Sequence, residues 1–206
     1  LLFYVTGQCL SVAIAPGPAG PFADSATGPL VCQQGGSIDP SPYAADGRLY
    51  LTWKQNAAVG GPTTIWAQPL TADGRSLAPG TAPSALLVAS QSWERSVIEG
   101  PFMWVAGGTD YLFYSGNDWN SASYAIGVAQ CAGPLGPCTK VPGPIYASQA
   151  GMLGPGGESV FSDAAGQSWI AFHAWRPGAV SYPNPRLLYL RKLAVVGGVP
   201  QLEPPG

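Results

Sequence analysis

Short apolar stretches rich in aromatic residues recur along the chain, and turn residues separate them. The clearest stretch is Leu49-Tyr50-Leu51-Thr52-Trp53, which follows the dipeptide Asp46-Gly47. Short runs of aromatic and β-branched residues bounded by Gly, Pro and Asp-Gly indicate antiparallel strands joined in hairpins. Long helices are not expected, because 28 Gly and 22 Pro among 206 residues interrupt regular elements throughout the chain.

The same arrangement occurs three times. An extended segment, a turn and an aromatic strand run through residues 38–53, 98–114 and 158–172. The acidic residues that open the copies, Asp39, Glu99 and Glu158, are spaced 60 and 59 residues apart. A unit of this length holds four short strands, which is one blade of a β-propeller. A β-sandwich is the alternative, but it does not predict an acid at the same place in each unit.

The number of units is smaller than a closed ring requires. At about 60 residues each, 206 residues make about three and a half blades, whereas a propeller has four or more. Leu2-Phe3-Tyr4 also resembles Leu112-Phe113-Tyr114, which lies in the middle of a unit. We therefore expect residues 1–206 to form a single incomplete β-propeller domain, completed by a segment before Leu1 or by a second chain.

Composition and charge exclude several classes of partner. Apolar residues make up 46% of the chain and charged residues 10%, which fits a compact core and not a disordered or coiled-coil protein. Nine basic and eleven acidic residues offer no surface for nucleic acid and no polybasic membrane anchor. No uninterrupted apolar run approaches the ~18 residues of a membrane span. Neither nucleic acid nor a membrane is expected as partner.

The four cysteines point to disulfide bonds. Cys9, Cys32, Cys131 and Cys138 include no Cys-x-x-Cys pair, so disulfides of a secreted, extracellular protein are favoured over a zinc site. A turn-rich Gly-Pro loop separates Cys131 from Cys138 and can bring the two together. Cys9 and Cys32 would then pair by elimination.

Two acidic residues are the first candidates for chemistry. The innermost strands of propeller blades line a central channel, so Asp39 and Glu99 are expected to meet there. Neighbouring carboxyl groups in a pocket disfavour each other's charged form, which keeps one of them protonated as a general acid. Hydrolysis of a glycosidic bond uses such an acid together with a second carboxylate. The alternative is that Asp39 starts a turn and Glu99 is a solvated acid at a strand end.

An ordered set of short motifs covering nearly the whole chain resembles glycoside hydrolase family 43. The motifs are Ile38-Asp39-Pro40, Asp46-Gly47-Arg48-Leu49-Tyr50-Leu51, Trp93-Glu94, Val97-Ile98-Glu99-Gly100-Pro101, Tyr111-Leu112-Phe113-Tyr114-Ser115, Tyr124-Ala125-Ile126-Gly127-Val128-Ala129, Gly154-Pro155-Gly156 and Phe172-His173-Ala174-Trp175. The resemblance implies a five-bladed β-propeller. It also implies a glycosidase that hydrolyses α-L-arabinofuranosides or β-D-xylosides of plant-type polysaccharides with inversion.

The resemblance also assigns catalytic roles. Glu99 matches the general acid, and Asp39 matches the aspartate that raises the pKa of the acid and orients it. The general base of the family is an aspartate of the first blade, and no residue of this chain matches it. The isolated chain is therefore expected to be inactive. The alternative is that Asp39 is itself the base. The alternative functions are a non-catalytic carbohydrate-binding propeller and a purely structural propeller fragment.

Four further residues are candidates for substrate binding. Trp93 and Trp119 could stack on a sugar, since aromatic faces pack on its apolar face, and Trp119 lies in a polar loop that suggests a position at the rim. Packing between blades is the alternative for such tryptophans. His173, the only histidine, matches a pocket-wall or structural position of the family. Glu94 is expected to be ion-paired or to contact substrate.

No metal and no cofactor is predicted. The family has a Gly-Pro-Gly-His stretch whose histidine in some members helps to hold calcium through water. This chain has Gly157 at the fourth position, followed by Glu158. Calcium is therefore not expected, although Glu158 could act as a hard oxygen ligand in place of the histidine.

Overall fold

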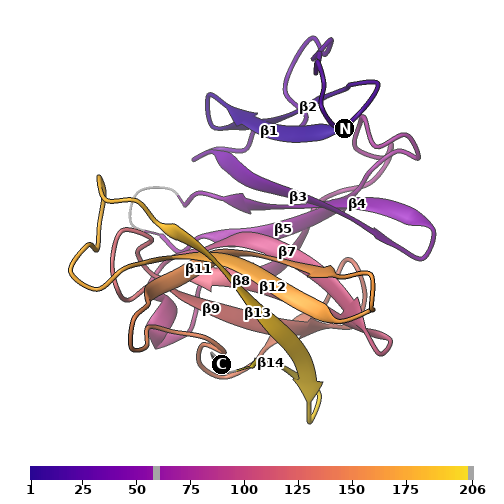
Figure 1. Ribbon diagram of the computed structural model, residues 1–206. Coiled ribbons are helices and arrows are strands. Elements are labelled where there is room, and N and C mark those ends of the chain that lie inside the picture. The colour runs from indigo at the N-terminus through magenta and orange to yellow at the C-terminus, as the bar shows by residue number, and fades with distance from the viewer. Residues whose placement is uncertain (58–60, 204–206) are drawn as a thin grey trace.

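The protein is all-β, apart from one short 3-10 turn, in the residues that the computed structural model describes, 1–57 and 61–203 (Figure 1). A two-stranded sheet and a four-stranded sheet come first along the chain: β1 (Leu2–Thr6) and β2 (Cys9–Ala13), then β3 (Ser37–Ala45), β4 (Arg48–Gln55), β5 (Thr64–Pro69) and β6 (Ser84–Val88). The 3-10 turn η1 (Ser92–Glu94) leads from this sheet to the next.

Two more four-stranded sheets complete the described chain. They consist of β7 (Ile98–Ala106), β8 (Thr109–Gly116), β9 (Ala125–Cys131) and β10 (Cys138–Lys140), then β11 (Leu153–Ser162), β12 (Ser168–Trp175), β13 (Leu187–Val196) and β14 (Val199–Leu202). In every four-stranded sheet, strands that follow one another in sequence pair antiparallel in the same order. Such meanders are propeller blades. Three complete blades and one two-stranded sheet confirm the prediction of about three and a half blades.

Glycine-containing turns close the hairpins at the predicted places. Asp46 and Gly47, with φ of 50° and 70°, join β3 to β4, and Gly107 and Gly108, with φ of 57° and 78°, join β7 to β8. Two consecutive residues with positive φ form the type I′ turn, whose twist matches that of the flanking strands. The turn residues thereby set the register of the inner hairpin in both blades.

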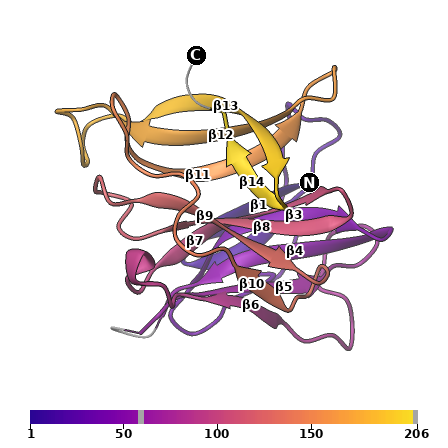
Figure 2. The same ribbon diagram turned by 90° about the horizontal axis from the view of Figure 1, so that it is seen from below.

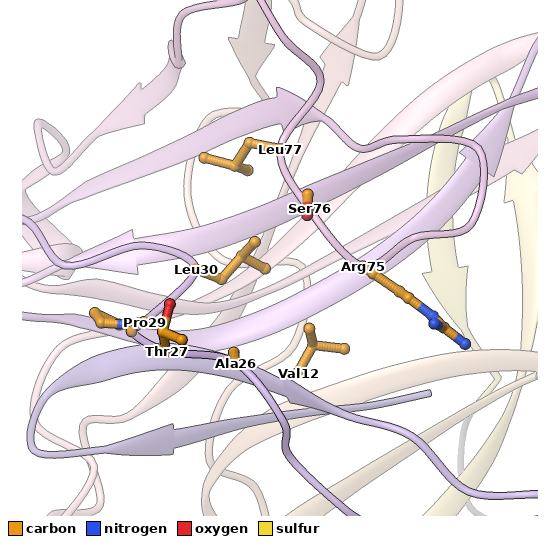
Figure 3. A pocket seen from close by; sticks show the side chains of 9 residues that line it. Val12, Ala26, Thr27, Pro29, Leu30, Arg75, Ser76 and Leu77 are labelled. Atoms are coloured by element: carbon orange, nitrogen blue, oxygen red, sulfur yellow. The ribbon is translucent and has the colours of Figure 1, made fainter.

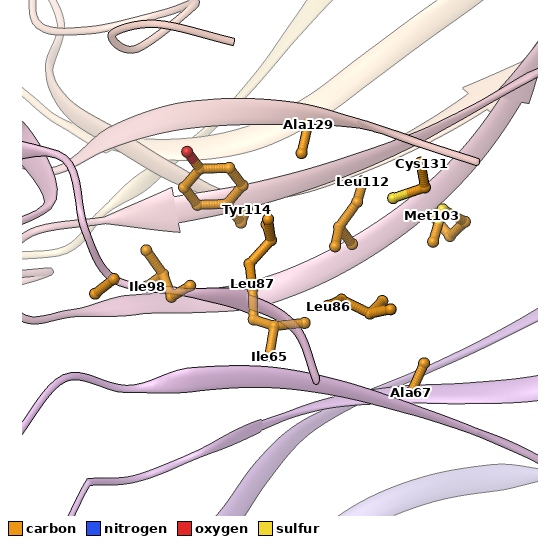
Figure 4. Close-up of a cluster of buried hydrophobic side chains, with 11 residues drawn as sticks. Ile65, Ala67, Leu86, Leu87, Ile98, Met103, Leu112, Tyr114, Ala129 and Cys131 are labelled. Carbon is orange, nitrogen blue, oxygen red and sulfur yellow. The ribbon is translucent and has the colours of Figure 1, made fainter. Parts of the chain in front are cut away.

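Buried apolar side chains lie between successive sheets. Figure 4 shows one such cluster, in which Ile65 and Leu87 of the β3–β6 blade face Leu112 and Tyr114 of the β7–β10 blade. A second cluster joins the β7–β10 and β11–β14 blades, and a third joins β1–β2 to the β3–β6 blade. Figure 2 shows the β11–β14 blade lying across the β7–β10 blade. This packing brings the innermost strands β3, β7 and β11 together.

Each innermost strand is interrupted at the same point. The pairing shifts after Ile38, Glu99 and Gly156, and the next residue in each strand, Asp39, Gly100 or Gly157, has a φ between 55° and 63°. Asp39 is thus equivalent to Gly100, and Glu99 to Ile38. The expectation that the three acids occupy equivalent positions is wrong. Glu99 lies one residue before the left-handed residue of its strand, Asp39 is that residue in its strand, and Glu158 lies one residue after it.

Two disulfide bonds join Cys9 to Cys32 and Cys131 to Cys138. The second pairing is the one that the turn-rich loop suggested, and the first is the one that the sequence offered only by elimination. The second bond lies between directly paired residues of β9 and β10. Within residues 1–57 and 61–203, no helix is long and apolar enough to cross a membrane.

A buried ion pair anchors the segment that enters the β7–β10 blade. Glu94 is fully buried, and its Oε2 lies 2.7 Å from the Nζ of Lys140. The Tyr114 hydroxyl donates to Oε1 at 2.8 Å, and the backbone N–H groups of Ser90 and Gln91 donate to Oε2. Burial by itself would raise the pKa of Glu94, but Lys140 and the other donors outweigh it and lower that pKa. The loop is therefore held by a charged, fully bonded carboxylate.

Replacing Lys140 by Met should destabilise the fold. Removing one partner of a buried ion pair leaves an uncompensated charge, so we expect the free energy of unfolding at pH 7 to fall by about 3 kcal/mol in urea denaturation. Because the pKa of Glu94 is depressed, its stabilisation is present above its ordinary value of 4.5 and is lost as pH falls. The difference from wild type should shrink in acid. Lys192→Met, at an exposed site of β13, is the control, and an equal loss in both variants would contradict the anchoring role.

Candidate active site

A cavity of about 270 Å³ opens over the converging inner strands. It is lined by Asp39, Glu99, Gly100, Trp119, Tyr124, Gly157, His173 and Arg186. Four of the residues singled out from the sequence, Asp39, Glu99, Trp119 and His173, thus share one pocket. The pocket draws on all three four-stranded blades, because Asp39 belongs to the first, Glu99 to the second and His173 to the third.

The carboxyl group of Glu99 is held from two sides. Nζ of Lys54, on β4 of the preceding blade, lies 2.7 Å from Oε2, and the Tyr124 hydroxyl donates to Oε1 at 2.7 Å. The Glu99 side chain is 13% exposed and that of Lys54 is 7% exposed. Two partners on different blades fix the orientation of the group, and its remaining surface faces the cavity.

Asp39 is connected to Glu99 through the backbone. Its Oδ2 accepts a hydrogen bond of 3.0 Å from the N–H of Gly100, the residue after Glu99. Asp39 itself adopts a φ of 55°, a left-handed conformation in which Asp and Asn are enriched among residues other than Gly. Burial raises the pKa of Asp39, the Gly100 N–H opposes this, and the neighbouring Glu99 raises it further. The two carboxyl groups therefore lie close together, and the charge of Glu99 disfavours ionisation of Asp39.

A third carboxyl group, that of Glu158, lies behind the cavity and is 3% exposed. The Ser115 hydroxyl donates to its Oε2 at 2.6 Å and accepts the Gly157 N–H at 2.8 Å. Burial raises the pKa of Glu158 to about 8, the Ser115 hydroxyl works against this rise, and the charges of Glu99 and Asp39 add to it. Glu158 is therefore mostly protonated at neutral pH.

Arg186 forms the rim of the cavity with aromatic residues. Its guanidinium group lies 5.2 Å from the ring centre of Trp119 and 5.6 Å from that of Trp175. Nη1 of Arg186 is 2.9 Å from Nε2 of His173, and since arginine only donates, Nε2 accepts and the ring proton is on Nδ1. Burial and the charge of Arg186 lower the pKa of His173 to about 4. His173 is thus a neutral wall residue at pH 7.

Comparison with known proteins identifies the family. The family model of the glycosyl hydrolases family 43 matches residues 2–199. This chain belongs to glycosyl hydrolase family 43. Its membership agrees with the family resemblance of the sequence motifs and places the chain among the glycosidases. A search of the curated proteins gives no match.

Solved structures of family 43 type share the fold. A thermostable family-43 glycoside hydrolase is 27% identical with a TM-score of 0.85, over 96% of this chain and 67% of that one. An endo-1,4-β-xylanase from Bacteroides thetaiotaomicron VPI-5482 is 29% identical with a TM-score of 0.86, over 98% and 70%. An α-L-arabinofuranosidase from Lactobacillus brevis, 22% identical over 96% and 66%, has a TM-score of 0.81. The chain spans about two thirds of the length of each.

Two residues that the sequence suggested for substrate binding in this family 43 chain lie elsewhere. The Trp93 ring stacks on Tyr114 with a centroid distance of 5.9 Å, and the fully buried Glu94 is bonded to Lys140. The short turn η1 directs both side chains into the packing between blades. Neither lines the cavity, and the expectation of substrate contact is corrected to a structural role. The ion-paired alternative for Glu94 is confirmed.

Sequence reasoning missed Lys54, Tyr124 and Arg186 as site residues. Lys54 had a detectable signal, because a lone lysine ends the apolar run Leu49-Tyr50-Leu51-Thr52-Trp53 in a chain with only nine basic residues. A lysine on a buried strand requires a carboxylate partner. Tyr124 and Arg186 gave no such signal, since each reaches the cavity from a loop that precedes a strand.

The surroundings of Glu158 do not suit calcium. Calcium takes six to eight oxygen ligands, whereas the Ser115 hydroxyl and the Gly157 N–H both act as donors next to this carboxyl group. Among the residues described, 1–57 and 61–203, no three His, Cys, Asp or Glu side chains are grouped to hold a metal ion.

Glu158 should make stability depend on pH in the direction opposite to Glu94. Its folded pKa of about 8 exceeds the ordinary value of 4.5, so the unfolded chain releases the proton first and stability falls as pH rises between these values. We expect urea denaturation to show that wild type loses roughly 3 kcal/mol between pH 5 and pH 8 relative to Glu158→Gln. Glu203→Gln, at an exposed position, is the control. Parallel pH profiles for wild type and Glu158→Gln would contradict the assignment.

Proposed function

We propose that this family 43 protein hydrolyses α-L-arabinofuranosidic or β-D-xylosidic bonds of plant-type polysaccharides with inversion. Glu99 is the general acid that protonates the leaving glycosidic oxygen. The observation that carries the proposal is the shared cavity in which Asp39 bonds the peptide of Gly100 next to Glu99, while Lys54 and Tyr124 orient the acid.

Asp39 acts through Glu99 and not on the substrate. Its bond to the Gly100 N–H fixes the strand that carries Glu99, and its carboxyl group disfavours a second negative charge beside it. The bond to Gly100 thereby helps to aim the Glu99 side chain at the leaving oxygen. Asp39 is therefore a positioning residue, in the role that the family resemblance gives to the modulating aspartate.

The rim of the cavity supports a sugar as ligand. Trp119 is 42% exposed and offers an aromatic face, and the neutral His173 supplies a polar wall beside it. Such a combination of an aromatic face and hydrogen-bonding groups suits a ring that has apolar faces and equatorial hydroxyl groups. Relatives of this chain include an endo-1,4-β-xylanase at 29% identity, which supports a plant-type polysaccharide as substrate. The two disulfides support an extracellular location.

We further propose that the general base is supplied by a segment outside residues 1–206 or by a second chain. No residue matched to the family motifs takes the role of the base. The coverage of about two thirds of each similar structure supports the proposal, as does the presence of three four-stranded sheets in a family for which five blades are expected. The attacking water would then be activated from the side of the cavity that this chain leaves open.

A carbohydrate-binding propeller without catalysis is the second candidate function. The observation that favours it is the 2.7 Å ion pair between Lys54 and Glu99, because a charged carboxylate cannot donate a proton. Binding of sugar would require the cavity but not proton transfer. Replacement of Glu99 separates the two candidates.

Glu99→Gln should remove activity and preserve binding. Loss of a general acid costs about 10² to 10⁴ in rate, so kcat/KM for arabino- or xylo-oligosaccharides should fall by at least about a hundredfold. The loss should be smaller for 4-nitrophenyl glycosides, whose leaving group needs little protonation. The isosteric control is Glu203→Gln. Activity is measured in a polypeptide extended on the N-terminal side. Unchanged activity of Glu99→Gln in it would refute the assignment of the acid, and sugar binding without turnover by the extended wild type would favour the binding propeller.

The origin of the base is tested by comparing two polypeptides. We expect 4-nitrophenol to be released from the α-L-arabinofuranoside or the β-D-xyloside by a polypeptide extended on the N-terminal side, but not by residues 1–206 alone. Water cannot attack at a useful rate without a base. Activity of residues 1–206 alone would mean that one of its own acids, Asp39 first among them, is the base.

A further inference from the structure

A second cavity, of about 510 Å³, adjoins the first. Glu99 and Trp119 line both cavities. The remaining polar walls of the second cavity come from Lys54, Arg95, Ser96, Asn117 and Asp118. It lies where the β3–β6 and β7–β10 blades meet, whereas the first cavity extends toward the β11–β14 blade. The carboxyl group of Glu99 therefore stands at the boundary between two hollows.

The two oxygens of Glu99 are bonded by residues that line different cavities. Tyr124, which lines the first cavity, donates to Oε1, and Lys54, which lines the second, bonds Oε2. A general acid in a glycosidase protonates the oxygen that joins the sugar being released to the leaving group, so it lies between them. Since the first cavity holds both Asp39 and Glu99, it takes the sugar whose bond is cleaved.

We propose that the second cavity binds the leaving-group side of the substrate, a neutral sugar residue of an oligo- or polysaccharide, and that Arg95 determines this specificity. This inference rests on the proposed function. It assigns a site and a ligand class to residues that lie beyond the carboxyl pair, and it makes a sugar, not a small alcohol, the preferred leaving group.

The charges of the cavity walls balance. Lys54 is paired with Glu99 at 2.7 Å, and the exposed Arg95 and Asp118 have opposite charges. A wall that combines charged donors, a charged acceptor and the half-exposed face of Trp119 matches hydroxyl groups and the apolar face of a sugar. An anionic sugar would gain from Arg95 but would be repelled by Asp118. The balance therefore favours a neutral ligand.

The backbone holds Arg95 in place at some conformational cost. Its φ of 54° and ψ of −116° are a conformation that favours glycine. The preceding residue is the fully buried, ion-paired Glu94. Asn117, which lines the same cavity, also has a positive φ, of 79°, and its Nδ2 donates to the carbonyl of Trp93 at 2.6 Å. Strain of this kind persists where the surrounding structure imposes it and is concentrated at functional sites.

Another hollow provides a matched control. A cavity of about 440 Å³ lies between β2, the loop before β3 and the loop after β5, and it includes the exposed Arg75 (Figure 3). Its lining contains no carboxyl group and neither Glu99 nor Trp119. Removal of Arg75 thus deletes an arginine side chain, as removal of Arg95 does, but from a hollow that shares no residue with the two cavities at Glu99.

The test compares Arg95→Gly with Arg75→Gly by isothermal titration calorimetry, using residues 1–206. Glycine relieves the positive φ of Arg95, so this variant should fold at least as stably as wild type. We expect Arg95→Gly to raise the Kd for xylotriose or arabinotriose by about tenfold or more, because a hydrogen bond from a charged donor is lost. The Kd for xylose or arabinose, which fit the first cavity, should stay within about twofold. Arg75→Gly should change neither value.

The outcomes distinguish this inference from the proposed function. An unchanged trisaccharide Kd in Arg95→Gly, or an equal loss for mono- and trisaccharide, would overturn the role of Arg95 while leaving Glu99 as the acid. Failure of wild type to bind any of the four sugars would overturn both. A larger loss for a uronic-acid-bearing oligosaccharide than for the neutral one would overturn the assignment of a neutral ligand.

Discussion

Burial of sheet faces against neighbouring sheets is the constraint on which the rest of this structure depends. The buried side chains of the β7–β10 blade are divided between a cluster with the preceding blade and one with the following blade. A single four-stranded sheet cannot bury both of its faces, so each blade is stable only beside its neighbours. The apolar pattern of the strands thus places β7 between β3 and β11, and residues of all three line the cavity of the candidate site.

The polar groups of the site follow from that convergence. Lys54, Ser115 and His173 occupy equivalent places on the second strands, opposite Ile38, Glu99 and Gly156. Lys54 and Ser115 each bond an acid of the next blade, Glu99 and Glu158. One geometric relation, repeated from blade to blade, therefore supplies both the orientation of Glu99 and a hydrogen bond to Oε2 of the buried Glu158.

The sequence specified the blades better than the site. Turn pairs such as Asp46-Gly47, the alternation of aromatic residues and the spacing of Cys131 and Cys138 are local signals, and the strands, hairpins and disulfides agree with them. The equivalence of Asp39 with Gly100 was missed because a bulge adds a residue without a mark in the sequence. Trp93 and Glu94 were misplaced because side-chain direction in a short turn depends on the packing of the whole blade.

The bulges also bear on how the sheets avoid joining other molecules. β3, β7 and β11 are terminal strands of their sheets, and unpaired backbone groups along such strands can recruit further strands. The left-handed residues Asp39, Gly100 and Gly157 break the regular spacing of these groups. The opposite terminal strands β6, β10 and β14 are only five, three and four residues long. Bulged inner edges and short outer edges together oppose open-ended aggregation in a protein built almost entirely of strands.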